Sequence, residues 1–188
     1  MNAIPNAQAS LSVRFAPGGR ACVVFQAERG EGPRSGAIPT LTGALLASTL
    51  ARMGPTPQAE QLLRTAERAA EAFASMRQPS FLPDDMTLVD ADELGEAETM
   101  CTMLLPAEGD DFVKSVFATE DPDVAYRSFL YSLQYAVENL PPEALVALSS
   151  VLKGVTGRFR SGVAWPDAPT IERELAAGKA GITGQARH

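Results

Sequence analysis

The fold is decided by residues 121–155, which read DPDVAYRSFLYSLQYAVENLPPEALVALSSVLKGV. Asp121–Asp123 is a helix start, because an aspartate caps free N–H groups and a proline suits the first helical position. Apolar side chains then recur every three or four residues up to Leu140, which is one face of a helix. Pro141-Pro142 ends this helix and starts a second one, which we expect to stop at Lys153-Gly154. The stretch predicts two antiparallel helices that pack on each other and on a further layer.

Two pairs of alternating segments predict β-hairpins. Residues Ser10–Ala16 alternate apolar and polar side chains, the turn Pro17–Gly19 follows, and Ala21–Glu28 continues as a second strand. Further along the chain, Met86–Asp90 and Thr99–Leu105 flank an acidic turn. We expect these two segments to form a second hairpin.

Three more segments favour helices. Thr40–Met53 has Arg52 as its only charge. A helix without a polar face is usually buried on several sides, although the same surface also suits a partner. Thr56 is expected to cap a helix that extends to about Arg77, with its charged face in solvent. Ala107–Ala118 is expected to hold one short helix.

These elements predict an α+β fold, in which two antiparallel β-hairpins form one sheet covered by four to five helices. We expect a single domain over residues 1–155. A ββαα pattern occurs in it twice, at 11–77 and 86–154, although residue identities do not support a duplication. Residues 156–188 are rich in Gly and Pro and mildly basic, and we expect a partly ordered tail that docks through Trp165.

The net charge of −7 is unevenly distributed along the chain. Residues 80–123 contain thirteen Asp or Glu residues and a single basic residue, Lys114, whereas residues 1–79 and 153–188 each carry an excess of three positive charges. Such asymmetry bears on partners rather than on fold. It favours a basic protein partner, or a sister copy in a homo-oligomer, and the weak basic footprint argues against nucleic acid.

The sequence offers few residues for catalysis. Its only histidine is His188, the last residue, which excludes Ser-His-Asp and Cys-His catalysis and argues against a zinc site. Cys22 and Cys101 lie in apolar runs, and we expect buried, reduced thiols. The glycine-rich stretches lack the spacing of a phosphate-binding loop. We therefore expect neither a cofactor nor a metal.

No targeting or membrane segment is expected. The first ten residues lack the charged and apolar regions of a signal peptide, and the longest uncharged run, residues 35–51, is short for a membrane span. The sequence predicts a soluble, cytoplasmic protein with no membrane association.

The favoured functional hypothesis is a non-catalytic interaction protein: an adaptor, assembly factor or chaperone. It would bind a basic partner through its acidic surface, supplemented by two tyrosines one helical turn apart, because aromatic residues are enriched at interface cores. The candidate partner-binding residues are Asp84, Asp85, Asp90, Asp92, Glu93, Glu96, Asp110, Asp111, Tyr131 and Tyr135.

Two other classes stay open. A carboxylate-based enzyme, with or without a metal ion, centred on Asp84, Asp85, Asp90 and Asp92 requires these side chains to converge in a pocket. An acidic decoy that imitates nucleic-acid phosphates requires carboxylates spread over an exposed face. The sequence does not establish whether the protein is an enzyme, and we favour the non-catalytic hypothesis.

Overall fold

The computed structural model describes residues 7–27, 37–106, 113–162 and 164–171, and in this part of the chain five strands form one sheet. The strands are β1 (Ala7–Ala16), β2 (Arg20–Ala27), β3 (Thr87–Leu88), β4 (Glu98–Pro106) and β5 (Lys114–Phe117), in the order β3-β2-β1-β4-β5. The helices are α1 (Ala37–Met53), α2 (Pro57–Ala74), α3 (Ala91–Leu94), α4 (Pro122–Asn139) and α5 (Pro142–Arg160). The α+β class predicted from the sequence is confirmed.

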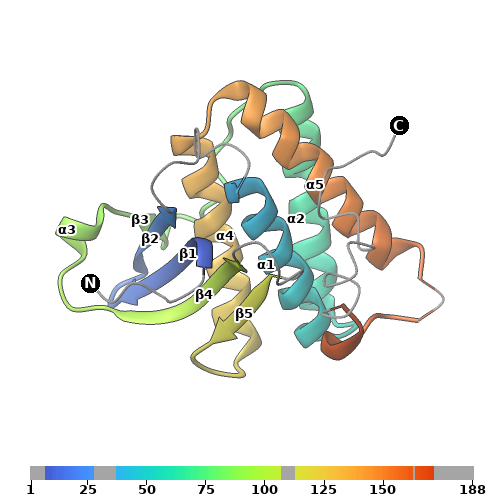
Figure 1. Cartoon of the computed structure of the whole chain (residues 1–188), viewed down its shortest axis with the longest axis horizontal. Coiled ribbons are helices and arrows are strands. Elements are labelled where there is room, and N and C mark those ends of the chain that lie inside the picture. Colours follow the sequence, from blue (N-terminus) through green and yellow to red (C-terminus); the bar gives the residue numbers. More distant parts are fainter. Residues whose placement is uncertain (1–6, 28–36, 107–112, 163, 172–188) are drawn as a thin grey trace.

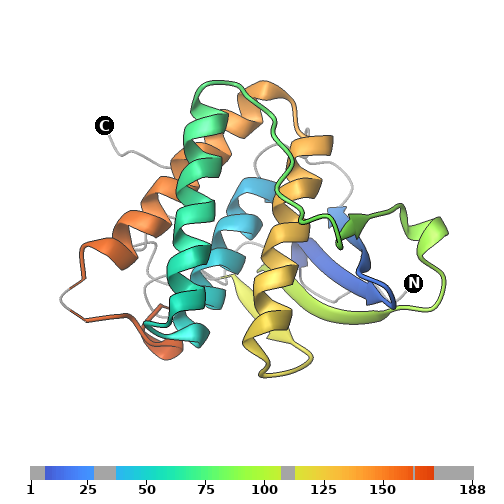
Figure 2. The same ribbon diagram turned by 180° about the vertical axis from the view of Figure 1, so that it is seen from behind.

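The long helices cover one face of the sheet in two layers (Figures 1 and 2). Helices α1 and α4 lie directly on the strands, and α2 and α5 pack on each other and on the far side of α1. Leu11 and Val13 of β1 and Met103 of β4 are fully buried between the sheet and the first helical layer. The core therefore extends from the sheet through α1 to the outer helices.

Helix α1 is buried on several sides, as its uniform composition predicted. The buried set includes 14 of its 17 residues, and Arg52 is its one charged residue. Three of its hydroxyl-bearing residues, Thr42, Ser48 and Thr49, are buried too, and the hydroxyl of Thr42 lies 3.3 Å from the hydroxyl of Ser132 on α4. A helix made of small and apolar residues suits this position, because neighbouring elements approach it closely on all sides.

Helices α4 and α5 begin where the sequence predicted. The carboxylate of Asp121 accepts a hydrogen bond of 2.9 Å from the N–H of Asp123, which caps α4. The expectation that the two helices pack on each other is wrong, whereas the expectation that they pack on a further layer is confirmed. Both pack on α1, and α5 also packs on α2. Helix α1 takes this position because its mostly apolar surface gains more from burial between helices than at an edge.

Helix α5 does not stop at Lys153-Gly154, and this prediction is wrong. It continues through Gly157 to Arg160. Beyond the expected end, Phe159 is buried, and Arg160 donates to Glu60 at 2.6 Å and to Glu67 at 2.9 Å on α2. These contacts outweigh the cost of about 1 kcal/mol for a glycine within a helix. The charged face of α2 is therefore partly an interhelical contact rather than wholly solvated.

The ion pairs between α5 and α2 lower the pKa of Glu60. Hydrogen bonds from Arg160, and then from Arg64, lower the pKa of Glu60 to about 2. The guanidinium of Arg64 lies 3.0 Å from the carboxylate of Glu60 on the same helix, at the i,i+4 spacing that brings two side chains together on a helix surface. The pairs lie at the helix surface, where solvent weakens them.

The first hairpin is confirmed, since β1 and β2 pair antiparallel from Ala9↔Ala27 to Ala16↔Arg20. The second hairpin is wrong. Strand β3 adds to β2 in parallel, whereas β4 pairs antiparallel with β1 at the other side. The two segments separate because β1 offers β4 a long apolar partner, while β3 has only two residues to pair. The sheet is consequently mixed rather than built from two hairpins.

The expected helix within Ala107–Ala118 is also wrong in its described part. Lys114–Phe117 forms β5, which pairs antiparallel with β4 at the edge of the sheet. Phe117 packs against the core, whereas Val116 is 57% exposed, so the side chains alternate as in a strand. The prediction failed because a helix and a strand both accept so short an apolar run, and the pairing with β4 is not local.

Candidate functional site: an acidic segment and the hollow beside it

The acidic surface is carried by residues 84–98, which we call the acidic segment. It contains β3 and α3 and leaves the body of the molecule beside β2 (Figure 1). The side chains of Met86 and Leu94 are buried and anchor it. Backbone hydrogen bonds of 2.9 Å run from the N–H of Thr87 and of Val89 to the edge of β2 and the turn before it. The segment is therefore fixed to the sheet at several points.

The start of the acidic segment depends on Gly19, in the turn between β1 and β2. Its φ of +71° favours glycine, and a Cβ placed there would lie 2.0 Å from the carbonyl oxygen of Asp85. The Gly19 carbonyl accepts hydrogen bonds from the N–H of Thr87 and from the hydroxyl of Tyr131 on α4. One backbone carbonyl thus joins the acidic segment, the first hairpin and the helical layer.

The carboxylates of the acidic segment face solvent. The exposed set is Asp84, Asp85, Asp90, Asp92, Glu93, Glu96 and Glu98, and the segment has no Lys or Arg. The nearest arginines bind its backbone instead: Arg20 donates to the carbonyl of Glu93 at 2.5 Å, and Arg14 to that of Ala97 at 3.4 Å. The ion pairs seen among the described residues lie elsewhere. One joins Arg52 to Glu120, and the others join glutamates of α2 to Arg64 and Arg160. The seven carboxylates are available to a partner.

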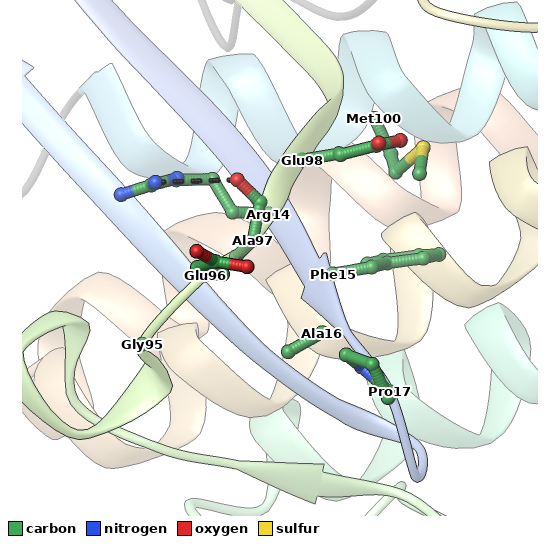
Figure 3. Close-up of a pocket in the computed structure, with 9 residues that line it drawn as sticks. All are labelled: Arg14, Phe15, Ala16, Pro17, Gly95, Glu96, Ala97, Glu98 and Met100. Atoms are coloured by element: carbon green, nitrogen blue, oxygen red, sulfur yellow. Dashed lines mark hydrogen bonds between the residues drawn. The ribbon is translucent and has the colours of Figure 1, made fainter.

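A hollow of about 690 Å³ opens where the acidic segment enters β4. Its lining comprises residues 14–17 of β1 and the following turn, residues 95–98, and Met100. Figure 3 shows the side chains of Arg14 and Phe15 on opposite sides of β1, with Glu96 on the Arg14 side and Glu98 beside Met100. The hollow therefore combines two carboxylates with apolar surface and one guanidinium.

A β-bulge shapes this hollow. Val13 pairs with Cys101 but the next residue, Arg14, pairs with Thr99, so Met100 is an extra residue on β4. A bulge bends its strand and redirects side chains, and bulges are common beside functional sites. Here it places Met100 in the lining of the hollow, close to Glu98.

The aromatic wall of the hollow is held by α4. The ring of Phe15 meets that of Tyr131 edge-to-face at 5.5 Å, and the guanidinium of Arg127 lies 5.1 Å from the centre of the Phe15 ring. Burial raises the pKa of the Tyr131 hydroxyl, and a hydrogen bond with Arg127 acts in the opposite direction. Phe15 is therefore a fixed surface and not a mobile side chain.

The structure separates the sequence-predicted residues into three groups. Six of them lie exposed on the acidic segment: Asp84, Asp85, Asp90, Asp92, Glu93 and Glu96. Asp110 and Asp111 lie outside the described residues. Tyr131 is fully buried and belongs to the core rather than to a binding surface, whereas Tyr135 is half-buried on α4.

Trp165, the residue expected to anchor the C-terminal segment, contacts the helical layer. Its indole N–H donates to the carbonyl of Leu50 at 2.9 Å, and its ring meets Phe159 edge-to-face at 5.1 Å. It joins the ends of α1 and α5, away from the acidic segment. Its observed contacts are within the helical layers.

Of the nine residues that line the hollow, sequence reasoning found only Glu96, and the missed residues include Arg14, Phe15, Glu98 and Met100. The alternation of the first strand placed Arg14 and Phe15 on opposite faces, but gave no sign that the end of the strand lines a hollow. Glu98 and Met100 meet it only through the pairing of β4 with β1 and the bulge. A clustering of carboxylates just before the apolar run of β4 was the one local signal.

The carboxylates of the acidic segment do not form a metal centre among the described residues. No group of three or more His, Cys, Asp or Glu side chains in that part of the chain is arranged to hold a metal ion. The carboxylate-based enzyme therefore stays an untested alternative. In the same described ranges, every helix is too short or too polar to cross a bilayer.

Comparisons of this chain with protein-family models, curated proteins and solved structures found no match.

Proposed function

We propose that this is a non-catalytic protein-binding protein, of the adaptor, assembly-factor or chaperone type, that binds a basic segment of a partner protein. The observation that carries the proposal is the hollow beside the acidic segment, whose lining combines the carboxylates of Glu96 and Glu98 with the side chains of Phe15 and Met100. Within this lining, Glu98 lies beside Met100. Apolar surface flanked by carboxylates suits a lysine or arginine side chain, because such side chains have an aliphatic stem and a charged head.

The remaining carboxylates extend the same surface. Asp84, Asp85, Asp90, Asp92 and Glu93 lie exposed on the segment that leads into the hollow. A row of charges of one sign steers a partner of the opposite sign and speeds its association, and salt screens the effect. A basic segment would therefore meet the acidic segment first and place one side chain in the hollow.

The acidic segment is already anchored to the sheet, so it does not need to fold when a partner binds. The buried side chains of Met86 and Leu94, together with the backbone bonds to β2, fix the charges in place before a partner arrives. A preorganised surface loses little conformational entropy when it binds. The proposed partner is a basic protein segment and not a nucleic acid, because seven exposed carboxylates would repel phosphates.

The test uses fluorescence anisotropy with two labelled peptides, one that alternates arginine with leucine and one that alternates glutamate with leucine. We expect the basic peptide to bind at low ionic strength and to bind more weakly at high ionic strength. The acidic peptide should not bind. The double variant Glu96→Gln/Glu98→Gln should weaken binding about tenfold, which corresponds to about 1.4 kcal/mol.

The matched control is Glu138→Gln/Glu143→Gln, which removes the same charge at the α4–α5 connection. It should bind the basic peptide like the wild type, apart from a small non-specific loss. Equal losses in the two double variants would mean that only net charge matters, and would contradict the role of the hollow. If this protein competes with DNA for a DNA-binding protein but does not bind the basic peptide, the result would instead support the decoy alternative.

A further inference from the structure

A second hollow, of about 450 Å³, lies between α2 and α4. The connection from α2 to the acidic segment, residues 77–83, closes one of its sides. Figure 2 shows this connection leaving the end of α2 and descending beside α4. The second hollow lies on the helical layers and is therefore separate from the hollow at the end of β1.

The connection that closes this second hollow is fixed. The N–H of Phe81 donates to the side-chain oxygen of Gln134 on α4 at 3.0 Å, and Gln134 is itself buried. The ring of Phe81 meets that of Phe73 edge-to-face at 5.7 Å. At its start, the N–H of Arg77 donates to the carbonyl of Ala72 at 2.8 Å, which closes the end of α2. The hollow therefore exists before any ligand binds.

Two arginines line the hollow, Arg68 from α2 and Arg77 from the connection. Both are exposed, and in the described ranges neither forms an ion pair. Arg64, one turn before Arg68 on the same helix, is by contrast paired with Glu60 at 3.0 Å. Glu71 is the one carboxylate in the lining, so two guanidinium groups face one acid.

Neutral hydroxyl groups lie beside Arg68. Its guanidinium donates to the hydroxyl of Thr65 at 3.4 Å, and Thr65 is buried at the bottom of the hollow. Tyr126 of α4 also lines it. Its hydroxyl is a hydrogen-bond donor, and burial raises its pKa, although the positive charge of Arg68 opposes this rise.

We propose that this second hollow binds a small organic anion, whose carboxylate or phosphate is held by Arg68 and Arg77 and whose apolar body lies on Phe81 and Leu82. Guanidinium groups recognise both oxyanions through paired N–H donors. A volume of about 450 Å³ lies within the usual range for small-molecule sites, which combine apolar lining with a few placed polar groups. The two hollows share no lining residue, and the ligand proposed here is opposite in charge to the partner proposed for the acidic segment.

Isothermal titration calorimetry with four probes tests the proposal: phenyl phosphate, benzoate, inorganic phosphate and benzyl alcohol. We expect phenyl phosphate and benzoate to bind in the millimolar range or better, and inorganic phosphate to bind more weakly because it lacks the apolar body. Benzyl alcohol, which lacks the charge, should bind at least tenfold more weakly than benzoate. The comparison of phenyl phosphate with benzoate identifies the preferred oxyanion.

Three substitutions on the same helix and connection locate the site. Arg68→Gln and Arg77→Gln should each weaken the binding of phenyl phosphate at least fivefold, whereas Glu71→Gln should strengthen it because it removes an opposing charge. Arg64→Gln is the matched control, since Arg64 does not line the hollow. These side chains are exposed, so their replacement should leave the fold intact.

Two results would overturn the proposal. The first is an equal loss of affinity in Arg64→Gln and Arg68→Gln, which would show a general attraction to the surface of α2. The second is the failure of every probe to bind the wild-type protein at millimolar concentration.

Discussion

Helix α1 and the acidic segment are similar in length and opposite in chemistry. Fourteen of the 17 residues of α1 are buried, and it contacts the sheet and three other helices. The acidic segment has two buried side chains, Met86 and Leu94, and seven exposed carboxylates. The stability of the molecule therefore resides in the helical layers, whereas the acidic segment is a surface that these layers support.

This difference follows from what each side chain gains on folding. An apolar side chain that leaves water contributes about 25 cal/mol per Å² of buried surface, and α1 is buried from all sides. The exposed carboxylates of the acidic segment gain nothing from burial and repel one another. Residues whose charges do not stabilise the fold are available for binding, and the predictions below test this division.

The largest expected effect is in the core of α1. Leu45 is fully buried, and Leu45→Ala removes its side chain and leaves a cavity. We expect the free energy of unfolding to fall by about 2–5 kcal/mol. Denaturant titration followed by circular dichroism measures this change. A loss below about 1 kcal/mol would mean that α1 is not the centre of the core.

A smaller effect is expected where the two regions meet. In Gly19→Ala, the new Cβ would collide with the carbonyl of Asp85, and the positive φ would be strained. We expect a loss of about 1–3 kcal/mol and a displaced acidic segment. Gly18→Ala is the matched control, because Gly18 also has a positive φ but no atom near its Cβ. If both variants lose the same stability, the contact with the acidic segment contributes nothing.

The buried thiol of Cys101 predicts a loss of stability at alkaline pH. Burial raises its pKa to about 12 in the folded protein, from an ordinary value near 9.0. Because the folded-state value is the higher one, the stabilisation is complete below pH 9 and declines as the pH rises towards 12. We expect a loss of about 1 kcal/mol by pH 10. The loss should be smaller in Cys101→Ala, and denaturant titrations at pH 8 and pH 10 measure it in both proteins. An identical loss in the wild type and in Cys101→Ala would contradict the assignment of this pH dependence to the Cys101 thiol.

The helices were predictable from the sequence because their signals are local. Asp121 and Thr56 cap their helices, and prolines mark where α4 and α5 begin. The exception is the end of α5, where Arg160 binds glutamates about 100 residues away in the sequence. A local stop signal at Gly154 carries no information about such a contact.

The sheet and the hollow were only partly predictable, because strand pairing joins distant residues. The first hairpin has a short turn and was found, but β3 and β5 depend on which edge each strand joins. The acidic character of residues 84–96 was visible in the sequence. The meeting of Phe15 with Glu98 and Met100 was not, because it depends on the register of β4 and on one bulge.

The most direct test of the division between stability and binding uses the double variant Glu96→Gln/Glu98→Gln. Its dissociation constant for the basic peptide and its free energy of unfolding are both measured, in the same buffer. We predict that the peptide binds about tenfold more weakly while the free energy of unfolding changes by less than about 0.5 kcal/mol. Unchanged peptide binding, or a loss of stability large enough to explain weaker binding, would contradict the proposed role of the acidic segment.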